Sequence, residues 1–297
     1  MGVCLTAIVC CALWGSAFPC IKIGYQLFQI DGNDISSQLL FAGCRFTLAG
    51  LLTILLGSLM NRRPLIPRKT SWIRIAKLSL FQTVIQYLFF YVGLAHTTGV
   101  KASIIEASNV FVAILIASLI FRQEKLDKHK IIGCIAGFAG VVLININQSG
   151  LDMSLSLTGE GFILLSTIAY AVSSVLIKIY SREDNPVMLS GWQFLLGGII
   201  MILCGYLTGG SVSVWTAPSI SMLFYLAAVS AVAYSLWGIL LKLNPVSKVA
   251  VFGFMNPVFG VILSALLLGE GQQAFGLTAI GALVLVCIGI YIVNKQP

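Results

Sequence analysis

The sequence predicts an all-α integral membrane protein of ten transmembrane helices, built as two inverted five-helix repeats around a central cavity. Three observations predict this fold class: a composition poor in charge, a one-sided distribution of positive residues, and an internal repeat. Of the 297 residues, 58% are hydrophobic and 9% are charged, and the mean hydropathy is +0.98. A soluble domain carries roughly 25% charged residues. Because this chain cannot cover a water-facing surface, most of it must face lipid or other lipid-embedded helices.

Ten apolar windows along the chain are long enough to be spans. A helix needs about 20 mostly apolar residues to cross the hydrocarbon core of a bilayer. Glycine, proline or charged residues separate each window from the next, which is typical of connections between helices. The windows cover residues 3–24, 36–60, 75–95, 101–121, 131–147, 160–180, 187–207, 219–241, 249–268 and 274–293.

The positive residues predict the orientation. With the N-terminus in the cytoplasm, 15 of the 18 Lys and Arg lie on the cytoplasmic side, Lys22 and Lys101 lie outside, and Arg45 lies within a span. Cytoplasmic loops are enriched in Lys and Arg, so we expect a multi-pass protein of the cytoplasmic membrane with both termini in the cytoplasm. The net charge of +8 then serves topology and contacts to anionic membrane lipid. Nucleic acid is excluded as a partner because no basic surface interleaved with aromatic residues is present.

An internal repeat divides the chain into residues 1–150 and 151–297. Five spans per half is an odd number, so the second half enters the membrane upside down, as in many secondary transporters with a site at the repeat interface. The matched segments keep the same order in both halves: Trp14 to Lys22 with Tyr170 to Lys178, Arg45-Phe46 with Gln193-Phe194, Asn109-Val-Phe with Pro257-Val-Phe, Glu124 with Glu270, and Ile132-Gly133 with Ile280-Gly281.

Two charged residues, Arg45 and Glu106, lie five or more residues from either end of a predicted span, where an ionised side chain is costly. An arginine at a helix centre costs about 2.5–3.5 kcal/mol on insertion scales. Arg45 is interpreted either as the counter-charge for a substrate carboxylate or phosphate, or as a structural tie to carbonyls or to Glu106. Glu106 is interpreted either as a proton relay or as the ion-pair partner of Arg45 or Lys101.

Hydroxyl, amide and aromatic side chains recur at helical spacing in several spans, away from the headgroup level where aromatic belts lie. For any one of these residues, core packing is the simpler explanation. As a set, they predict a mostly apolar, aromatic-lined pocket with a few polar fixtures. The predicted substrate-binding residues are Trp14, Ser16, Arg45, Gln82, Gln86, Tyr91, Glu106, Asn109, Tyr170, Ser174, Tyr234, Trp237 and Asn256.

Proline and glycine mark other features of the spans. Pro19 and Pro257 each remove a backbone donor from the helix, which predicts either hinges for alternating access or static kinks. The segment Gly133 to Gly137 is a GxxxG pattern, which favours close helix packing within one protomer and, as the alternative, dimerisation. The protein is therefore expected to be a monomer or homodimer. Glu124 and Glu270 are expected to cap the helices that follow them.

The sequence contains no pattern that predicts catalysis, a cofactor or a metal. The eight cysteines include no C-x-x-C pair, and the two histidines lie in separate loops. No nucleophile with a matching base and no G-x-S-x-G elbow occurs. A primary pump would need a P-loop, which is absent. We therefore predict that the chain is not an enzyme and that it needs neither a metal nor a cofactor.

Four short segments of the chain form a pattern typical of a known family. They are Leu13 to Phe18 with Lys22, Arg45-Phe46 with Ala49-Gly50, Glu124-Lys125-Leu126 and Leu268-Gly269-Glu270. On these residues the chain resembles a ten-span member of the drug/metabolite transporter superfamily, in the EamA group, over essentially its whole length. It departs from the family pattern at Arg122-Gln123-Glu124, where a Leu-Gly-Glu type turn is usual, at Asn109 in place of proline, and at Tyr170 in place of tryptophan.

The resemblance and the pocket together predict a transporter that works by alternating access. Amino acids or similar amphipathic metabolites are the expected substrates, export is the expected direction, and Glu106 is the candidate for proton coupling. A competing hypothesis is an exchanger of phosphorylated or nucleotide-linked metabolites, which requires several cations at mid-membrane where only Arg45 is placed. The remaining hypotheses are a vitamin or nucleobase transporter, a channel, and a membrane-embedded enzyme.

Overall fold

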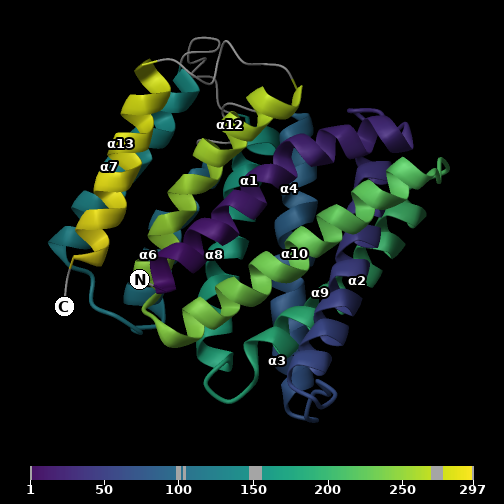
Figure 1. The fold of residues 1–297 in the computed structure, drawn as a ribbon, viewed down its shortest axis with the longest axis horizontal. Helices are drawn as coiled ribbons and strands as arrows, with labels where there is room; N and C mark the ends of the chain where they lie inside the picture. The colour runs from purple at the N-terminus through teal and green to yellow at the C-terminus, as the bar shows by residue number, and fades with distance from the viewer. Residues whose placement is uncertain (1, 98–101, 103–104, 147–155, 269–276, 296–297) are drawn as a thin grey trace.

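The computed structural model of this chain describes residues 2–97, 102, 105–146, 156–268 and 277–295 (Figure 1). Within these residues the regular structure is helical throughout. The first half contains α1 (Gly2–Phe28), α2 (Ile35–Met60), α3 (Ser71–Ser79), the π-helical segment η1 (Leu80–Ile85), α4 (Gln86–Ala95), α6 (Asn109–Leu115), the π-helical segment η2 (Ile116–Ile120) and α7 (Lys128–Ile146).

The boundary predicted at residue 150 lies outside the described residues, and the elements of the predicted second half follow it. This half contains the π-helical segment η3 (Leu157–Gly161), α8 (Phe162–Tyr180), α9 (Pro186–Leu207), α10 (Ala217–Leu243), α11 (Val246–Ala250), the 3₁₀ segment η4 (Val251–Phe254), α12 (Met255–Leu268) and α13 (Leu277–Asn294).

Six of the described helices are long and apolar enough to cross a membrane: α1, α2, Ser71–Ala95, Leu157–Tyr180, α9 and α10. Three further apolar helices are shorter, namely Ile105–Ile120, Val246–Gly260 and Ile280–Asn294. An all-helical fold with six apolar helices of membrane-spanning length is therefore confirmed for the described residues, whereas ten spans and an inverted repeat stay predictions.

Glycines bring α2 and α9 into backbone contact. A Cβ on Gly50 would lie 2.5 Å from the backbone nitrogen of Leu195, and a Cβ on Gly198 would lie 2.4 Å from that of Thr47. Because backbone atoms cannot move aside as a side chain can, only glycine fits at these positions. The contact brings Phe46 into parallel stacking with Phe194, its counterpart in the predicted repeat, with ring centroids 5.2 Å apart.

The GxxxG segment serves the second close helix pair. A Cβ on Gly133 would lie 2.8 Å from the carbonyl oxygen of Gly289 on α13, and Gly289 in turn abuts Gly137. The predicted role of this motif in packing within one protomer is confirmed. In Figure 1 the pair α7 and α13 lies at one end of the longest axis, and the pair α2 and α9 lies toward the other end.

The segments predicted to be cytoplasmic gather at one end of the helix bundle. Arg68 Nη2 donates to Asp184 Oδ1 at 3.0 Å, and Arg182 donates to Gln123. These contacts join the connections 61–70, 181–185 and 121–127. Both chain termini lie toward the same edge of the molecule in Figure 1. We refer to this end as the loop end.

Asp184 is the centre of an ion-pair cluster at the loop end. Its carboxylate is only 2% exposed and accepts hydrogen bonds from Ser71 Oγ at 2.7 Å, Arg74 Nη1 at 2.7 Å and Arg68 Nη2 at 3.0 Å. Burial is the largest single influence on the pKa of Asp184 and raises it, but the hydrogen bonds and positive charges together outweigh burial. The pKa is therefore lowered from its ordinary value, so the folded state favours the ionised carboxylate.

Asp184→Asn is expected to destabilise the folded protein by roughly 1.5–3 kcal/mol, the range for a hydrogen bond to a charged group. Because the folded pKa is lowered, the stabilisation is fully present above the unfolded pKa of about 3.9 and is lost as the pH falls through the folded value. Thermal unfolding in detergent between pH 3 and pH 7 measures both effects. Asp31→Asn, the same charge change at an exposed residue, is the control. If the two variants unfold at the same temperature at pH 7, the cluster does not stabilise the fold.

Candidate functional site

A cavity of about 380 Å³ lies between helices of both halves. Its volume is within the roughly 300–1,000 Å³ range of small-molecule sites. The lining includes exposed Lys22 and Gly32 near the connection of α1 to α2, which lies opposite the loop end. Deeper in the molecule, Asn109 of α6 and Asn256 of α12 also line it. The cavity thus extends from the end opposite the loops toward the middle of the bundle.

Most of the predicted substrate-binding residues line this single cavity, although they come from segments far apart in the sequence. Pro257, one of the two predicted hinges, lines it as well, whereas Pro19 is buried within the continuous helix α1 outside the lining. The predicted residues in the lining are Trp14, Arg45, Gln86, Tyr91, Glu106, Asn109, Tyr170, Tyr234 and Asn256.

Four predicted residues lie outside this lining. Ser174 and Trp237 border a second space of about 10 Å³, which shares Asn109 and Asn256 with the main cavity. The Ser16 hydroxyl is instead hydrogen-bonded to the hydroxyl of Tyr225 at 2.8 Å and donates to the carbonyl of Leu13. Gln82 is buried in the π-helical segment η1.

The sequence reasoning left several lining residues out of the predicted site, four of them aromatic. Tyr87 donates or accepts a hydrogen bond with Tyr234 at 3.1 Å between the two hydroxyls. The repeat could have identified Tyr87: Arg45 and its counterpart Gln193 are 148 positions apart, and Tyr87 and Tyr234 are 147 apart. Helical spacing from Trp14 could have identified others on the same face of α1. The further lining residues are Phe18, Tyr25, Tyr87, Phe90, Ser166 and Thr167.

The guanidinium of Arg45 is buried with few partners. The residue is 2% exposed. Its Nε and Nη2 donate to Ser230 Oγ at 3.2 and 2.9 Å, and its Cζ lies 4.9 Å from the centroid of the Phe46 ring. Among the described residues, no carboxylate pairs with it. A guanidinium has five N–H donors, so Arg45 brings a positive charge and unused donors to the cavity.

Glu106 brings a carboxyl group to the same cavity. It forms no salt bridge with Arg45 or with any other cation of the described residues, and Lys101, its other predicted partner, lies outside them. The cavity lining therefore holds one guanidinium and one carboxyl group that do not form an ion pair with each other.

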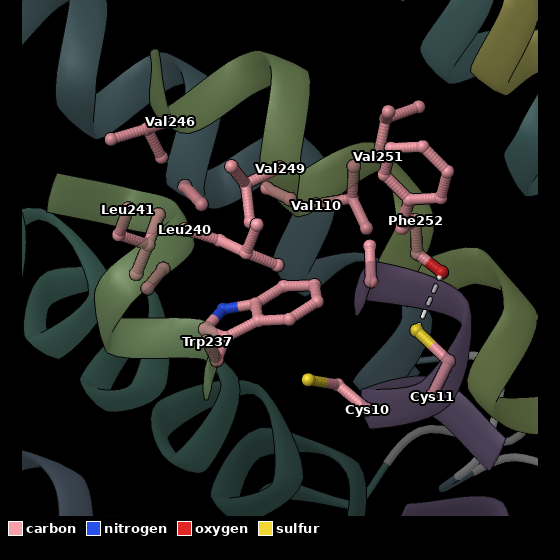
Figure 2. Close-up of a cluster of buried hydrophobic side chains, with 14 of the residues drawn as sticks. Cys10, Cys11, Val110, Trp237, Leu240, Leu241, Val246, Val249, Val251 and Phe252 are labelled. Atoms are coloured by element: carbon pink, nitrogen blue, oxygen red, sulfur yellow. Dashed lines mark hydrogen bonds between the residues drawn. The ribbon is translucent and has the colours of Figure 1, made fainter. Parts of the chain in front are cut away.

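An apolar cluster packs beside Trp14 of the cavity lining, on its loop-end side (Figure 2 shows the side chains of the cluster). Trp14 in the lining packs edge-on against Tyr234 and Trp237, with ring centroids 5.0 Å apart in both pairs. Beyond Trp237, side chains of four helices and of η4 fill the space, and the Cys11 thiol donates to the carbonyl of Phe252 at 3.2 Å. We call this cluster the apolar seal; it comprises Cys10, Cys11, Val110, Trp237, Leu240, Leu241, Val246, Val249, Val251 and Phe252.

In the described part of the chain, no three His, Cys, Asp or Glu side chains gather as a metal site would require. The chemistry available in the cavity is therefore that of one guanidinium, one carboxylate, several hydroxyls and amides, and many rings. Such a set can bind and orient a small solute by hydrogen bonding and stacking.

Comparison with known proteins identifies the family. A profile of the EamA-like transporter family matches residues 1–146 and 157–295. An uncharacterized transporter of Archaeoglobus fulgidus is 30% identical over 291 residues, which are 96% of this chain and 94% of that protein. A protein of Salmonella typhimurium named as a probable amino-acid metabolite efflux pump is 25% identical over 96% of this chain and 92% of its own length.

A solved crystal structure shares the fold. It superposes with a TM-score of 0.78 over 99% of this chain and 98% of its own, at 16% sequence identity. Because the family profile covers nearly the whole sequence in both halves, its match does not depend on one motif. The chain belongs to the EamA-like transporter family.

Proposed function

We propose that this protein is a secondary transporter for small zwitterionic metabolites, foremost amino acids with apolar or aromatic side chains. The observation that carries the proposal is that Arg45 and Glu106 line one aromatic cavity without pairing with each other. Arg45 suits a carboxylate, Glu106 suits an ammonium group, and the rings suit an apolar side chain. Burying either charge is costly without a partner, and a zwitterion supplies both partners at once.

The packing of the helices supports alternating access between two inverted halves, residues 1–150 and 151–297. α1 packs against α10 and α12, and its counterpart α8 packs against α4 and α6. α2 packs against its own counterpart α9, as α7 does against α13. Phe46 likewise meets Phe194, and Tyr87 meets Tyr234. If the first half took up the packing of the second half and the second half that of the first, one end of the cavity would close and the other would open, as in inverted-repeat transporters.

The charge distribution supports an outward-open state. The loop end carries the connections rich in Lys and Arg, so the positive-inside rule assigns it to the cytoplasm. In this orientation both termini are cytoplasmic, the cavity opens to the outside of the cytoplasmic membrane, and the apolar seal faces inward. Export would then load substrate after the seal opens and release it through the mouth near Gly32.

The name of the Salmonella relative, a probable amino-acid metabolite efflux pump, supports the same substrate class and direction. A phosphorylated or nucleotide-linked substrate is less favoured, because Arg45 is the one buried cation of the described cavity lining. A vitamin or nucleobase would leave at least one of the two cavity charges without a partner.

Transport by purified protein in liposomes tests the proposal. Preloaded unlabelled L-phenylalanine should drive saturable counterflow of radiolabelled L-phenylalanine. Phenethylamine, which lacks the carboxylate, and 3-phenylpropionate, which lacks the ammonium group, should compete at least tenfold more weakly. Absence of saturable flux across a panel of amino acids, vitamins and nucleobases would contradict a transport function of this kind.

Glu106→Gln is expected to uncouple transport from protons, because glutamine keeps the size and polarity of the side chain but takes up no proton. Uptake driven by an imposed pH gradient should fall at least tenfold. Counterflow at equal pH should continue with a raised KM, because glutamine no longer supplies the counter-charge for the ammonium group. Glu106→Asp, which keeps a titratable group, is the matched control and should retain the gradient dependence. An unchanged dependence on the pH gradient in Glu106→Gln would dismiss proton coupling through this residue.

A further inference from the structure

A single serine holds the guanidinium of Arg45. Ser230 Oγ, which is 0% exposed, accepts from Arg45 Nε and Nη2 and donates its own hydrogen to the carbonyl of Leu226 at 3.1 Å. A hydroxyl has one donor and two acceptor positions. The donor and both acceptor positions of the Ser230 hydroxyl are therefore occupied, and both acceptor positions bind the arginine.

This arrangement leaves one defined edge of the guanidinium free. Ser230 occupies the edge formed by Nε and Nη2, and the Phe46 ring lies against the cation. The donors left over are those of Nη1 and the second hydrogen of Nη2. Two parallel N–H groups of this kind bind a carboxylate in bidentate fashion.

The second half contains the same arrangement without the charge. Gln193 stands where the first half has Arg45, and Thr83 stands 147 positions before Ser230. Thr83 Oγ1 donates to Gln193 Oε1 at 2.7 Å, and both residues are buried outside the lining of the cavity. Each half thus contributes a hydroxyl that bonds to the equivalent position of the other half: Ser230 bonds to Arg45, and Thr83 bonds to Gln193. Of these two pairs, only the pair with Ser230 includes a charged group that faces the cavity.

We propose that Ser230 is a positioning residue: it turns the free edge of Arg45 toward the carboxylate of the substrate and so sets the preference for carboxylates over their neutral analogues. This inference rests on the proposed function. Without the hydroxyl, the guanidinium loses its described hydrogen-bond partner and can rotate toward other oxygens. The carboxylate of the substrate then meets a mobile guanidinium, and ordering the guanidinium on binding costs more of the binding free energy.

Kinetics of four proteins in liposomes test the inference: wild type, Ser230→Ala, Ser230→Thr and Thr83→Val. The probes are L-phenylalanine and L-phenylalaninamide, which differ at the carboxyl group. Ser230→Ala should raise the KM for L-phenylalanine at least tenfold, change the maximal rate less than twofold, and leave the KM for the amide within twofold. Ser230→Thr restores the hydroxyl and should return the KM to within threefold of wild type.

Thr83→Val removes the equivalent hydrogen bond in the other half and should leave the ratio of the two KM values unchanged. If Ser230→Ala and Thr83→Val shift the KM for L-phenylalanine equally, or if neither shifts it, the positioning role is overturned while saturable flux by the wild type still upholds the proposed function. A wild type that transports no carboxylate overturns both.

A replacement variant and a second measurement keep the test decisive if Ser230→Ala folds poorly or transports slowly. Ser230→Cys fills nearly the same space with a weak acceptor and takes the place of the alanine variant if that protein does not fold. L-Phenylalanine should protect Arg45 from modification by phenylglyoxal in the wild type and in Thr83→Val, as read by mass spectrometry. Equal protection in the alanine or cysteine variant overturns the inference.

Discussion

Arg45→Gln is expected to raise the KM for L-phenylalanine by a hundredfold or more. The variant removes the buried positive charge of the cavity and the two free donors that face a carboxylate. Each hydrogen bond to a charged group contributes about 1.5–3 kcal/mol, and about 1.4 kcal/mol corresponds to a tenfold change in affinity. Loss of a bidentate contact therefore exceeds a factor of one hundred.

The chain itself indicates that glutamine fits at this position. Gln193 occupies the equivalent place in the second half, next to Phe194 and hydrogen-bonded to Thr83. Arg45→Gln should accordingly fold, which separates a binding defect from a folding defect. Lys77→Gln removes the same charge from an exposed residue of α3 and is the control. Unaltered affinity for carboxylates in a folded Arg45→Gln protein would show that the arginine has a structural role alone.

The six long apolar helices could be predicted from the sequence because the bilayer imposes a simple rule on composition. A span must be apolar over its whole length and must satisfy its backbone internally. The same rule makes Arg45 and Glu106 conspicuous, and both line the cavity. The two charged residues inside spans were therefore found from the sequence, whereas the aromatic lining residues Phe18, Tyr25, Tyr87 and Phe90 were left out.

Gln82 and Ser16 were predicted to be in the site but lie outside the cavity lining, and their local geometry explains why. Gln82 belongs to the π-helical segment η1, whose wider turn shifts the following side chains relative to the regular period of 3.6 residues. Faces assigned from regular spacing are therefore offset at this point. Ser16 lies beside residues of the lining, but its hydroxyl bonds to Tyr225, which is 209 positions away.

Long-range contacts also explain an error at the loop end. Glu124 was predicted to cap the helix that follows it, yet Asp127 does so by accepting from the Lys130 backbone N–H at 2.9 Å. Glu124 instead reaches Ser247, which is 123 positions further along the chain. Its repeat counterpart Glu270 lies outside the described residues. No local pattern reveals a partner at that distance, because the partner is set by the tertiary fold.

Glu124→Ala is expected to let the apolar seal open more often at the loop end and so to raise the labelling rate of Cys11 at least tenfold. The Glu124 carboxylate accepts from the Ser247 backbone N–H at 3.0 Å, from the Ser247 hydroxyl, and from Lys130 Nζ at 2.8 Å. Glu124 follows the helix that carries Val110, and Ser247 begins the segment that carries Val249. The carboxylate therefore ties together two sides of the apolar seal, which must separate for the loop end to open.

The magnitude follows from the same bonds. Loss of hydrogen bonds worth about 1.5–3 kcal/mol each to a charged group shifts a two-state equilibrium tenfold or more toward the open form. Cys11 is a native reporter because its thiol is free and lies within the seal at 0% exposure. Site-resolved mass spectrometry after treatment with a membrane-permeable maleimide measures its labelling rate.

Two comparisons separate opening of the seal from general loosening. Cys134, also buried and free, belongs to the same hydrophobic core but lies on α7, which carries no seal residue and packs against α13. It should therefore stay protected in Glu124→Ala, whereas unfolding would expose both thiols. Glu183→Ala removes an acidic residue at the same end, but that carboxylate pairs with Arg74 instead of bridging the seal, so it should leave Cys11 protected. A Cys11 rate in Glu124→Ala equal to that of the wild type would mean that the apolar contacts alone hold this end closed, and that opening is limited by separating Trp237 from its neighbours.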